Sequence, residues 1–168
     1  MAELWDVLDA NGNATGQLHE RGQPMREGDY HLTVSVWIAN DKGEYLISQR
    51  SPNKPSPNLW ECTGGNAVAG DDSLTTALKE VHEELGIVLD PSNGLMLKHQ
   101  VRKCSCNHCL ADIWLFWQNV DLQTVTLAPE ETCGAMWAGR DDINRMIDEG
   151  TFTTWELFAC MDELFEEE

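Results

Sequence analysis

Long apolar runs are missing from the 168 residues of this chain. No stretch approaches the roughly 18 consecutive apolar residues that a membrane-spanning helix needs. The first residues, MAELWD, are acidic and lack the basic and apolar regions of a secretory signal. We therefore expect a cytoplasmic protein that has no membrane partner.

Basic residues are also scarce, because 11 Lys and Arg stand against 29 Asp and Glu and give a formal net charge of −18 at pH 7. A surface with this charge repels the phosphate backbone of nucleic acids, which argues against DNA or RNA polymers as partners. A small phosphate compound remains compatible with it when a metal cation mediates the binding.

Neither internal repeats nor low-complexity segments interrupt the chain, and its 42% apolar and 24% charged residues are typical of globular domains. The length fits one domain over residues 1–168. We expect an N-terminal hairpin and lead-in over residues 1–29 and a core over residues 30–168, in a monomer or a homodimer.

A mixed sheet with helices is predicted by the order of the local patterns. Alternating residues in YHLTVSVWIA (30–39), a turn at NDKG and the segment EYLISQR (44–50) predict two strands at the centre of the sheet. The later elements are strands at 95–103, 110–118 and around Met136-Trp137, a helix from Asp141 or Asp142 to Gly150, and a helix from Thr153 or Thr154. The pattern is that of an α+β fold.

Three prolines in SPNKPSPN (51–58) interrupt the sheet and predict a loop. This loop begins next to Arg50 and carries Lys54. Both cations are candidate contacts for a substrate phosphate, and exposed surface charges are the alternative.

The segment GGNAVAGDDSLTTALKEVHEELGI (64–87) predicts a glycine-rich loop followed by a helix. Asp71 or Asp72 caps the first turn, and Gly86 ends the helix in a left-handed conformation. The apolar residues recur every three or four positions and form one stripe that packs on the sheet. They are Leu74, Ala77, Leu78, Val81 and Leu85.

Glu80, Glu83 and Glu84 form a second stripe on this helix, at positions i, i+3 and i+4. Like charges at this spacing repel, and the negative end of the helix dipole adds to the repulsion. A hard divalent cation such as Mg²⁺ or Mn²⁺ relieves it and binds phosphate oxygens at the same time. The alternative is a solvated acidic face.

The spacing of this segment resembles the Nudix box. Gly65 is followed at the family intervals by Asp71, by Lys79-Glu80, by Glu83-Glu84 and by Gly86-Ile87. Two positions differ from the family pattern, since Asp71 stands where the family has Glu and Lys79 stands where it has Arg. Both residues keep their charge, although Lys79 lacks the forked guanidinium.

The resemblance extends over about residues 3–160 and is greatest to the Nudix subgroup similar to isopentenyl diphosphate isomerase. It implies an α/β/α sandwich in which the box helix packs on a mixed sheet. It also implies that Glu80, Glu83 and Glu84, with the carbonyl of Gly64 or Gly65, bind Mg²⁺ or Mn²⁺ beside the substrate and take part in catalysis. Glu80 is the first choice for a metal ligand and a possible general base. The implied reaction is the attack of water on a diphosphate linkage.

A further catalytic glutamate is implied by the resemblance, in a loop late in the chain. Glu131 stands at the expected place, with Glu130 as the alternative residue and a solvated turn after Pro129 as the alternative structure. Asp71 and Lys79 are expected to support the helix. Gly65, Arg50 and Lys54 are expected to contact the substrate.

Three functions follow from these residues. The first is hydrolysis of a small diphosphate, such as a nucleoside di- or triphosphate or a nucleotide sugar. The second is a catalytically weak Nudix-type module that only binds a diphosphate, which the changes at Asp71 and Lys79 suggest. The third is an isomerase, which needs a cysteine at the position of Gly64; Cys62 lies two residues away, an offset of about 7 Å along a strand.

Six cysteines in a chain expected in the cytoplasm indicate thiols or metal ligands rather than a disulfide framework. The segment CSCNHC places Cys104, Cys106, His108 and Cys109 close together. These are ligand types that hold Zn²⁺, so a zinc site is one interpretation and a reduced loop without metal is the other. Cys62 is expected to be a buried small residue.

Overall fold

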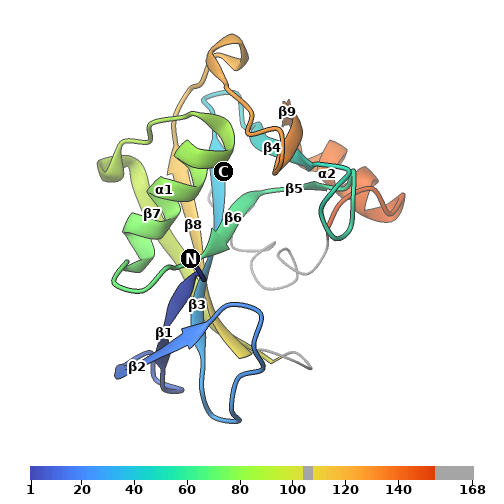
Figure 1. The fold of residues 1–168 in the computed structure, drawn as a ribbon. Coiled ribbons are helices and arrows are strands. Elements are labelled where there is room, and N and C mark those ends of the chain that lie inside the picture. The colour runs from blue at the N-terminus through green and yellow to red at the C-terminus, as the bar shows by residue number, and fades with distance from the viewer. Residues whose placement is uncertain (104–107, 154–168) are drawn as a thin grey trace.

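The computed structural model of the chain describes residues 1–103 and 108–153. Figure 1 shows these residues as a twisted sheet with a helix on each side and a small hairpin at one end. The strands are β1 (Leu4–Leu8), β2 (Ala14–Glu20), β3 (His31–Ala39), β4 (Tyr45–Arg50), β5 (Trp60–Glu61), β6 (Thr63–Asn66), β7 (Gly94–Lys103), β8 (His108–Trp117) and β9 (Thr132–Ala138). The helices are α1 (Ser73–Leu85), α2 (Arg140–Asp148) and the 3-10 turns η1 (Pro91–Asn93) and η2 (Leu122–Thr124).

The main sheet has the strand order β5-β4-β3-β8-β7, with β6 paired to β3 and β9 paired to β4. The β3–β8 pair is parallel, and the other pairs of this sheet are antiparallel. The sheet is therefore mixed, as the sequence predicts, and the α+β class is confirmed.

Strand β3 lies at the centre of this sheet, which confirms its predicted place. Both faces of the strand are covered, since Ser35 is only 2% exposed and Trp37 is fully buried. A strand that is covered on both faces buries its small polar residues together with its apolar ones.

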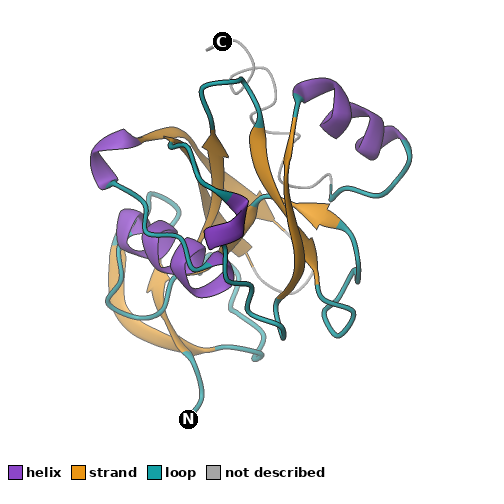
Figure 2. Cartoon of the chain, turned by 90° about the horizontal axis from the view of Figure 1, so that it is seen from above, coloured by secondary structure: helices purple, strands orange, loops and turns teal. Residues whose placement is uncertain are grey.

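Two apolar clusters cover the two faces of the sheet, one under each helix. Figure 2 shows helices on both sides of the strands. On one face, Val81 and Leu85 of α1 pack on Val34 and Val36 of β3. On the opposite face, Ile143 and Met146 of α2 pack in the cluster that contains Trp37, Tyr45 and Ile47. The layers are those of an α/β/α sandwich, and they hold α1 firmly against the sheet.

Helix α1 begins and ends at the predicted signals. The side chain of Asp72 accepts a hydrogen bond of 2.7 Å from the backbone N–H of Thr75, so Asp72 is the N-cap. Gly86 has φ +68° and donates its N–H to the carbonyl of His82. Both ends of the helix are thus specified by local hydrogen bonds. These ends determine which residues of the helix face the sheet and which face away from it.

Helix α2 differs from the prediction at its start. Gly139 is the N-cap and the helix begins at Arg140, whereas Asp141 and Asp142 lie inside the first turn. The Asp142 carboxylate accepts a hydrogen bond from the N–H of Gly139 at 3.2 Å, so it satisfies the helix end from within the first turn. Gly150, with φ +73°, follows the helix as predicted.

The helix predicted from Thr153 or Thr154 lies almost wholly outside the described residues, which end at Thr153. The N-terminal hairpin is confirmed, because β1 and β2 pair antiparallel and Leu8 bridges to Tyr30 at the start of the core. In the described ranges, no helix is long and apolar enough to cross a membrane.

Leu85→Ala tests the packing of α1. Leu85 is 1% exposed and contacts the cluster under the helix, so we expect the free energy of unfolding to fall by about 3 kcal/mol. Val88→Ala is the control, because Val88 is 76% exposed and its truncation should change stability by less than about 0.5 kcal/mol. Urea denaturation of both variants measures this, and equal losses would contradict the packing described.

Candidate active site

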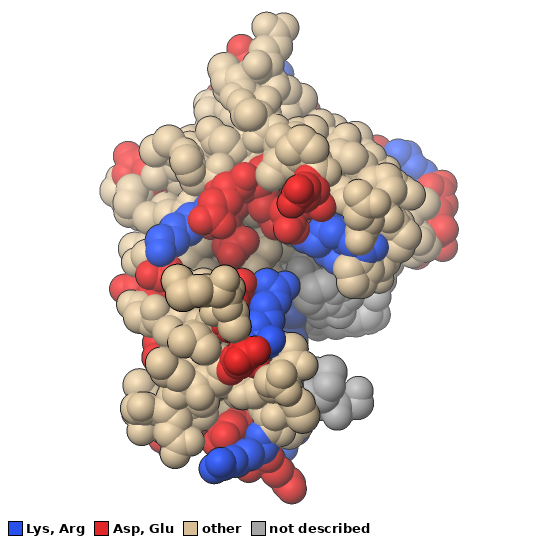
Figure 3. Space-filling model, in the orientation of Figure 1, with Lys and Arg blue, Asp and Glu red and all other residues tan. Residues whose placement is uncertain are grey.

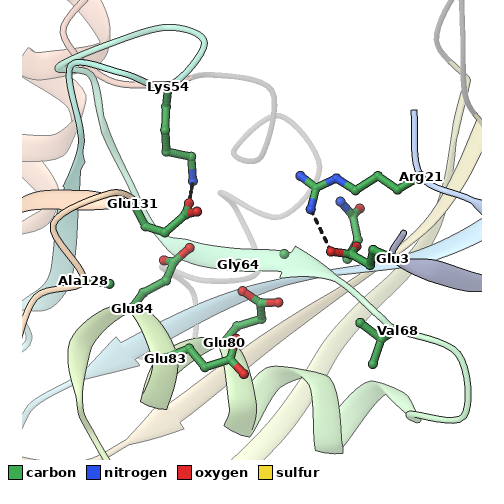
Figure 4. Close-up of a pocket in the computed structure, with 12 residues that line it drawn as sticks. Glu3, Arg21, Lys54, Gly64, Val68, Glu80, Glu83, Glu84, Ala128 and Glu131 are labelled. Carbon is green, nitrogen blue, oxygen red and sulfur yellow. Dashed lines mark hydrogen bonds and ion pairs between the residues drawn. The ribbon is translucent and has the colours of Figure 1, made fainter. Parts of the chain in front are cut away.

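A pocket of about 320 Å³ opens beside α1, between the glycines of β6 and the loop that precedes β9. Five glutamates dominate its lining, and Figure 3 shows acidic atoms gathered on this face. Figure 4 shows how their side chains lie around it. The lining consists of Glu3, Arg21, Lys54, Gly64, Gly65, Asn66, Val68, Glu80, Glu83, Glu84, Ala128 and Glu131.

The three glutamates of α1 reach this pocket together, as their helical spacing predicts (Figure 4). Their burial differs, since Glu84 is only 7% exposed, Glu80 is half-buried and Glu83 is exposed. Glu84 is therefore the most buried of the three carboxylates, Glu80 is intermediate, and Glu83 is the most exposed.

Gly65 lets the backbone of β6 lie directly against the Glu80 side chain. A Cβ added at Gly65 would stand 2.3 Å from the carboxyl carbon of Glu80, a distance at which atoms clash. A Cβ at Gly64 would stand 2.3 Å from the backbone oxygen of Val34 on the neighbouring strand. Both glycines are thus needed for close approach, one to the carboxylate and the other to the sheet.

Lys79 and Asp71, the two residues that differ from the family pattern, form an ion pair. Lys79 Nζ lies 2.5 Å from Asp71 Oδ2 and joins the helix to the loop in front of it. The pair raises the pKa of Lys79, which therefore stays charged. The substituted residues keep a direct link between the loop and the helix.

Two loops far apart in sequence meet across the pocket and bring Lys54 to Glu131. Ser51 donates its N–H to the carbonyl of Glu131 at 3.0 Å and its hydroxyl to the carbonyl of Glu130 at 2.9 Å. The Lys54 ammonium then pairs with the Glu131 carboxylate (Figure 4). Of the two candidate glutamates, Glu131 lines the pocket, whereas Glu130 is not in the described lining.

Arg50 lies next to this pocket and is held by protein groups. Its Nη1 donates to both oxygens of Glu61, at 3.0 and 2.8 Å, and its Nε donates to the carbonyl of Pro55 at 2.8 Å. Burial raises the pKa of Glu61, while the Arg50 hydrogen bond lowers it. A phosphate contact by Arg50 stays a prediction, and Glu61 competes for the same guanidinium.

Burial raises the pKa of Glu80 to about 7, and the nearby charges of Glu83, Glu131 and Glu3 act in the same direction. Burial also raises the pKa of Glu84 to about 8, against the lowering effect of Lys54. Each charged carboxylate loses water and faces other carboxylates, so the proton is held more firmly. These two side chains can hold or release a proton near neutral pH.

The donor chemistry of the pocket fits a hard divalent cation, because carboxylate oxygens are the ligands that Mg²⁺ and Mn²⁺ prefer. Glu80, Glu83, Glu84 and Glu131 would supply such oxygens, beside the backbone at Gly64. In the described part of the chain, no three His, Cys, Asp or Glu side chains converge in a metal-binding group. The carboxylates line the pocket wall without meeting at one point.

Two charged lining residues, Glu3 and Arg21, were not predicted from the sequence. Arg21 Nη1 donates to Glu3 Oε2 at 3.0 Å, on the side of the pocket opposite Lys54 (Figure 4). Both come from the N-terminal hairpin, whose sequence carries no motif that connects it with the glutamates of α1. Only the arrangement of the elements in space reveals their role in the lining.

The remaining predicted metal ligands lie elsewhere. Cys104 and Cys106 fall outside the described residues, while His108 and Cys109 begin β8 and belong to no metal-binding group among the described residues. Cys62 is 1% exposed in the cluster under α2, which confirms that it is a buried small residue.

Comparisons with known proteins agree with this geometry. A family model described as NUDIX domain matches residues 29–159. An uncharacterised Nudix hydrolase of Listeria monocytogenes is 34% identical over 152 residues, which cover 89% of this chain and 88% of that protein. An isopentenyl-diphosphate Delta-isomerase of Pectobacterium atrosepticum is 26% identical over 155 residues, which cover 89% and 84%.

The crystal structure of a Deinococcus radiodurans protein superposes with a TM-score of 0.78 and covers 97% of this chain and 99% of that protein. The two chains are 18% identical, so this likeness shows a shared fold. The predicted sandwich is confirmed by it.

The raised pKa of Glu84 predicts how stability depends on pH in the absence of divalent cations. The folded protein keeps this proton up to about pH 8, whereas an unfolded glutamate releases it near pH 4.5, so the free energy of unfolding falls as the pH rises between these values. Glu84→Gln should therefore be more stable than the parent by on the order of 3 kcal/mol at pH 8 and nearly equal at pH 5.

Denaturation at both pH values in a chelating buffer measures this difference. Glu27→Gln makes the same chemical change at an exposed position and serves as the control. A stability difference between Glu84→Gln and the parent that is the same at pH 5 and pH 8 would contradict the raised pKa.

Proposed function

The chain belongs to the Nudix family of hydrolases, and from this we propose that it cleaves a diphosphate linkage in a small organic compound with the help of a divalent cation. The observation that carries the proposal is the acidic pocket, where Glu80, Glu83 and Glu84 of one helix stand beside Gly64-Gly65 and Glu131. The substrates expected are nucleoside di- and triphosphates or nucleotide sugars.

Glu80, Glu83 and Glu84, with the carbonyl of Gly64, would hold the cation. When bound, Mg²⁺ or Mn²⁺ supplies the positive charge that an anionic diphosphate needs in order to enter an acidic pocket. Asp71 and Lys79 support this arrangement by tying the loop to the helix.

In the hydrolysis, a water oxygen forms a bond to phosphorus and the bridging P–O bond breaks. The leaving phosphate takes the electron pair of the broken bond, and the water gives up a proton to a protein carboxylate. We assign this proton to a carboxylate oxygen of Glu131, because Lys54 pairs with that carboxylate over the pocket and the backbone N–H of Ser51 binds the backbone carbonyl of Glu131. Glu80, with a pKa of about 7, is the second acceptor.

The Asp71–Lys79 pair bears on the alternative, a module that binds a diphosphate without cleaving it. These two substitutions suggest such a module, yet the residues still form the ion pair that joins loop and helix. An isomerase is less compatible with the pocket, because Cys62 packs in the core under α2 and Gly64 occupies the position of the required thiol.

Hydrolysis of a panel of nucleoside diphosphates, triphosphates and nucleotide sugars, followed by chromatography of the nucleotide products, tests the proposed function. We expect turnover with Mg²⁺ or Mn²⁺ and its loss in a chelator. Glu80→Gln should lower kcat by at least about 10²-fold, the usual effect of removing a catalytic carboxylate. If the protein is only a binding module, it should bind the diphosphate, and neither the parent nor the Glu80→Gln variant should form product.

Glu131→Gln and Glu130→Gln form a matched pair that tests the proton acceptor. The first removes a carboxylate that lines the pocket, so kcat should fall by about 10²-fold. The second changes the adjacent exposed residue, whose backbone carbonyl rather than its side chain contacts Ser51, so kcat should stay within about twofold. Steady-state kinetics at saturating Mg²⁺ measure both, and equal kcat values for the two variants would remove Glu131 from the mechanism.

A further inference from the structure

We propose that a basic cavity beside the acidic pocket binds the terminal phosphate of the substrate, with Arg21 and Arg102 as its specificity-determining residues. The enzyme would then select diphosphates that end in an unesterified phosphate over those that are esterified at both ends. This inference rests on the proposed function, because it concerns the substrate of the same site.

The second cavity also has a volume of about 320 Å³. It shares a wall with the acidic pocket, since Arg21, Lys54, Gly64, Gly65 and Asn66 line both. A single ligand can therefore extend from one cavity into the other across the glycines of β6.

The two cavities have opposite charge. Four basic residues, Arg21, Arg50, Lys54 and Arg102, face one acidic residue, Glu61, so the basic cavity has a formal charge of +3. The acidic pocket has five acidic and two basic residues, a formal charge of −3. Figure 3 shows basic atoms directly beside the acidic group on this face. This concentration is notable in a chain with 11 basic residues and a net charge of −18.

The cations of this cavity come from elements that are far apart in sequence. Arg21 follows β2, Lys54 lies in the proline-rich loop and Arg102 lies on β7. On β7, Arg102 is in register with Cys109 of β8, which also lines the cavity. The fold thus brings together cations that are far apart in the chain.

Arg21 is held in position by a short chain of contacts. The indole N–H of Trp5 donates to Glu3 Oε1 at 2.7 Å, and Glu3 Oε2 accepts from Arg21 Nη1 at 3.0 Å. Trp5 is 3% exposed and stacks on the ring of His31 at 4.1 Å. A guanidinium carries five N–H donors in a fork, so Arg21 can contact Glu3 and a phosphate oxygen at the same time.

A terminal phosphate suits this cavity better than an esterified one. A terminal phosphate carries between one and two negative charges near pH 7 and offers three acceptor oxygens, whereas an esterified phosphate carries one charge and two such oxygens. In a nucleotide sugar, the uncharged sugar would also occupy the space next to the cations, where a terminal phosphate would place a charged oxygen. The gain in affinity from Arg21 and Arg102 is therefore specific to the terminal phosphate.

Binding of α,β-methylene-ADP and of an ADP-ribose that carries the same methylene bridge, measured by calorimetry with Mg²⁺, tests this inference without turnover of either ligand. We expect Arg21→Gln and Arg102→Gln each to weaken the binding of α,β-methylene-ADP by about tenfold, the size of one charge-assisted hydrogen bond. The same changes should alter binding of the ADP-ribose analogue by less than about twofold. Arg26→Gln is the matched control, because Arg26 is exposed in the loop after β2 and should leave both affinities unchanged.

The outcomes separate this inference from the proposed function. Selective weakening of α,β-methylene-ADP binding supports the inference even if no substrate is cleaved, in which case the hydrolase proposal alone fails. Three results would each overturn it. Arg21→Gln could weaken the binding of both ligands equally, both arginine variants could leave the affinities unchanged, or the wild-type protein could bind the ADP-ribose analogue more tightly than α,β-methylene-ADP. Because Arg21 is largely exposed, Arg21→Gln should fold even if Arg102→Gln does not.

Discussion

The close approach between Gly65 and Glu80 is the contact on which the rest of the site depends. A Cβ at position 65 would stand only 2.3 Å from the Glu80 carboxyl carbon, so any other residue there would turn the end of the Glu80 side chain away from β6. Glu83 and Glu84 keep their places beside Glu80 because all three residues belong to one helix. The absent side chain at position 65 therefore leaves the room that the Glu80 carboxylate occupies next to the strand.

Packing on the other side of α1 opposes the repulsion among these carboxylates. Burial raises the pKa values of Glu80 and Glu84, and the charges of neighbouring carboxylates act in the same direction. The apolar stripe on the same helix, with Val81 and Leu85 almost fully buried, holds the helix on the sheet despite that cost. The amphipathic pattern thus lets the fold keep an acidic group that would not assemble by itself.

The features that sequence alone predicts well are those set within one element. The caps at Asp72 and Gly86, the two stripes of α1 and the central place of β3 follow from spacing over a few residues. The features that it predicts poorly depend on contacts between distant segments. Lys54 and Glu131 are 77 residues apart and meet because Ser51 binds the loop before β9, while the side chain that engages Arg50, Glu61, lies on another strand. The sequence predicts Asp141 or Asp142 as the N-cap of α2 because aspartate is a commoner N-cap than glycine, whereas the N-cap is Gly139.

The shared wall between the two cavities explains how an acidic protein can treat an anionic ligand selectively. Gly64 and Gly65 lie between the carboxylates of the acidic pocket and Arg50 and Arg102 of the basic cavity, and Arg21 and Lys54 line both. Glycine puts no side chain between the two cavities. A ligand that lies across this wall meets charges of opposite sign within its own length, so its two ends are not interchangeable. Electrostatics would then fix which phosphate lies over the carboxylates before any contact with the rest of the ligand forms. In the proposed complex, the orientation of the substrate thus depends on Gly65, which also lies against Glu80, and on Gly64 beside it.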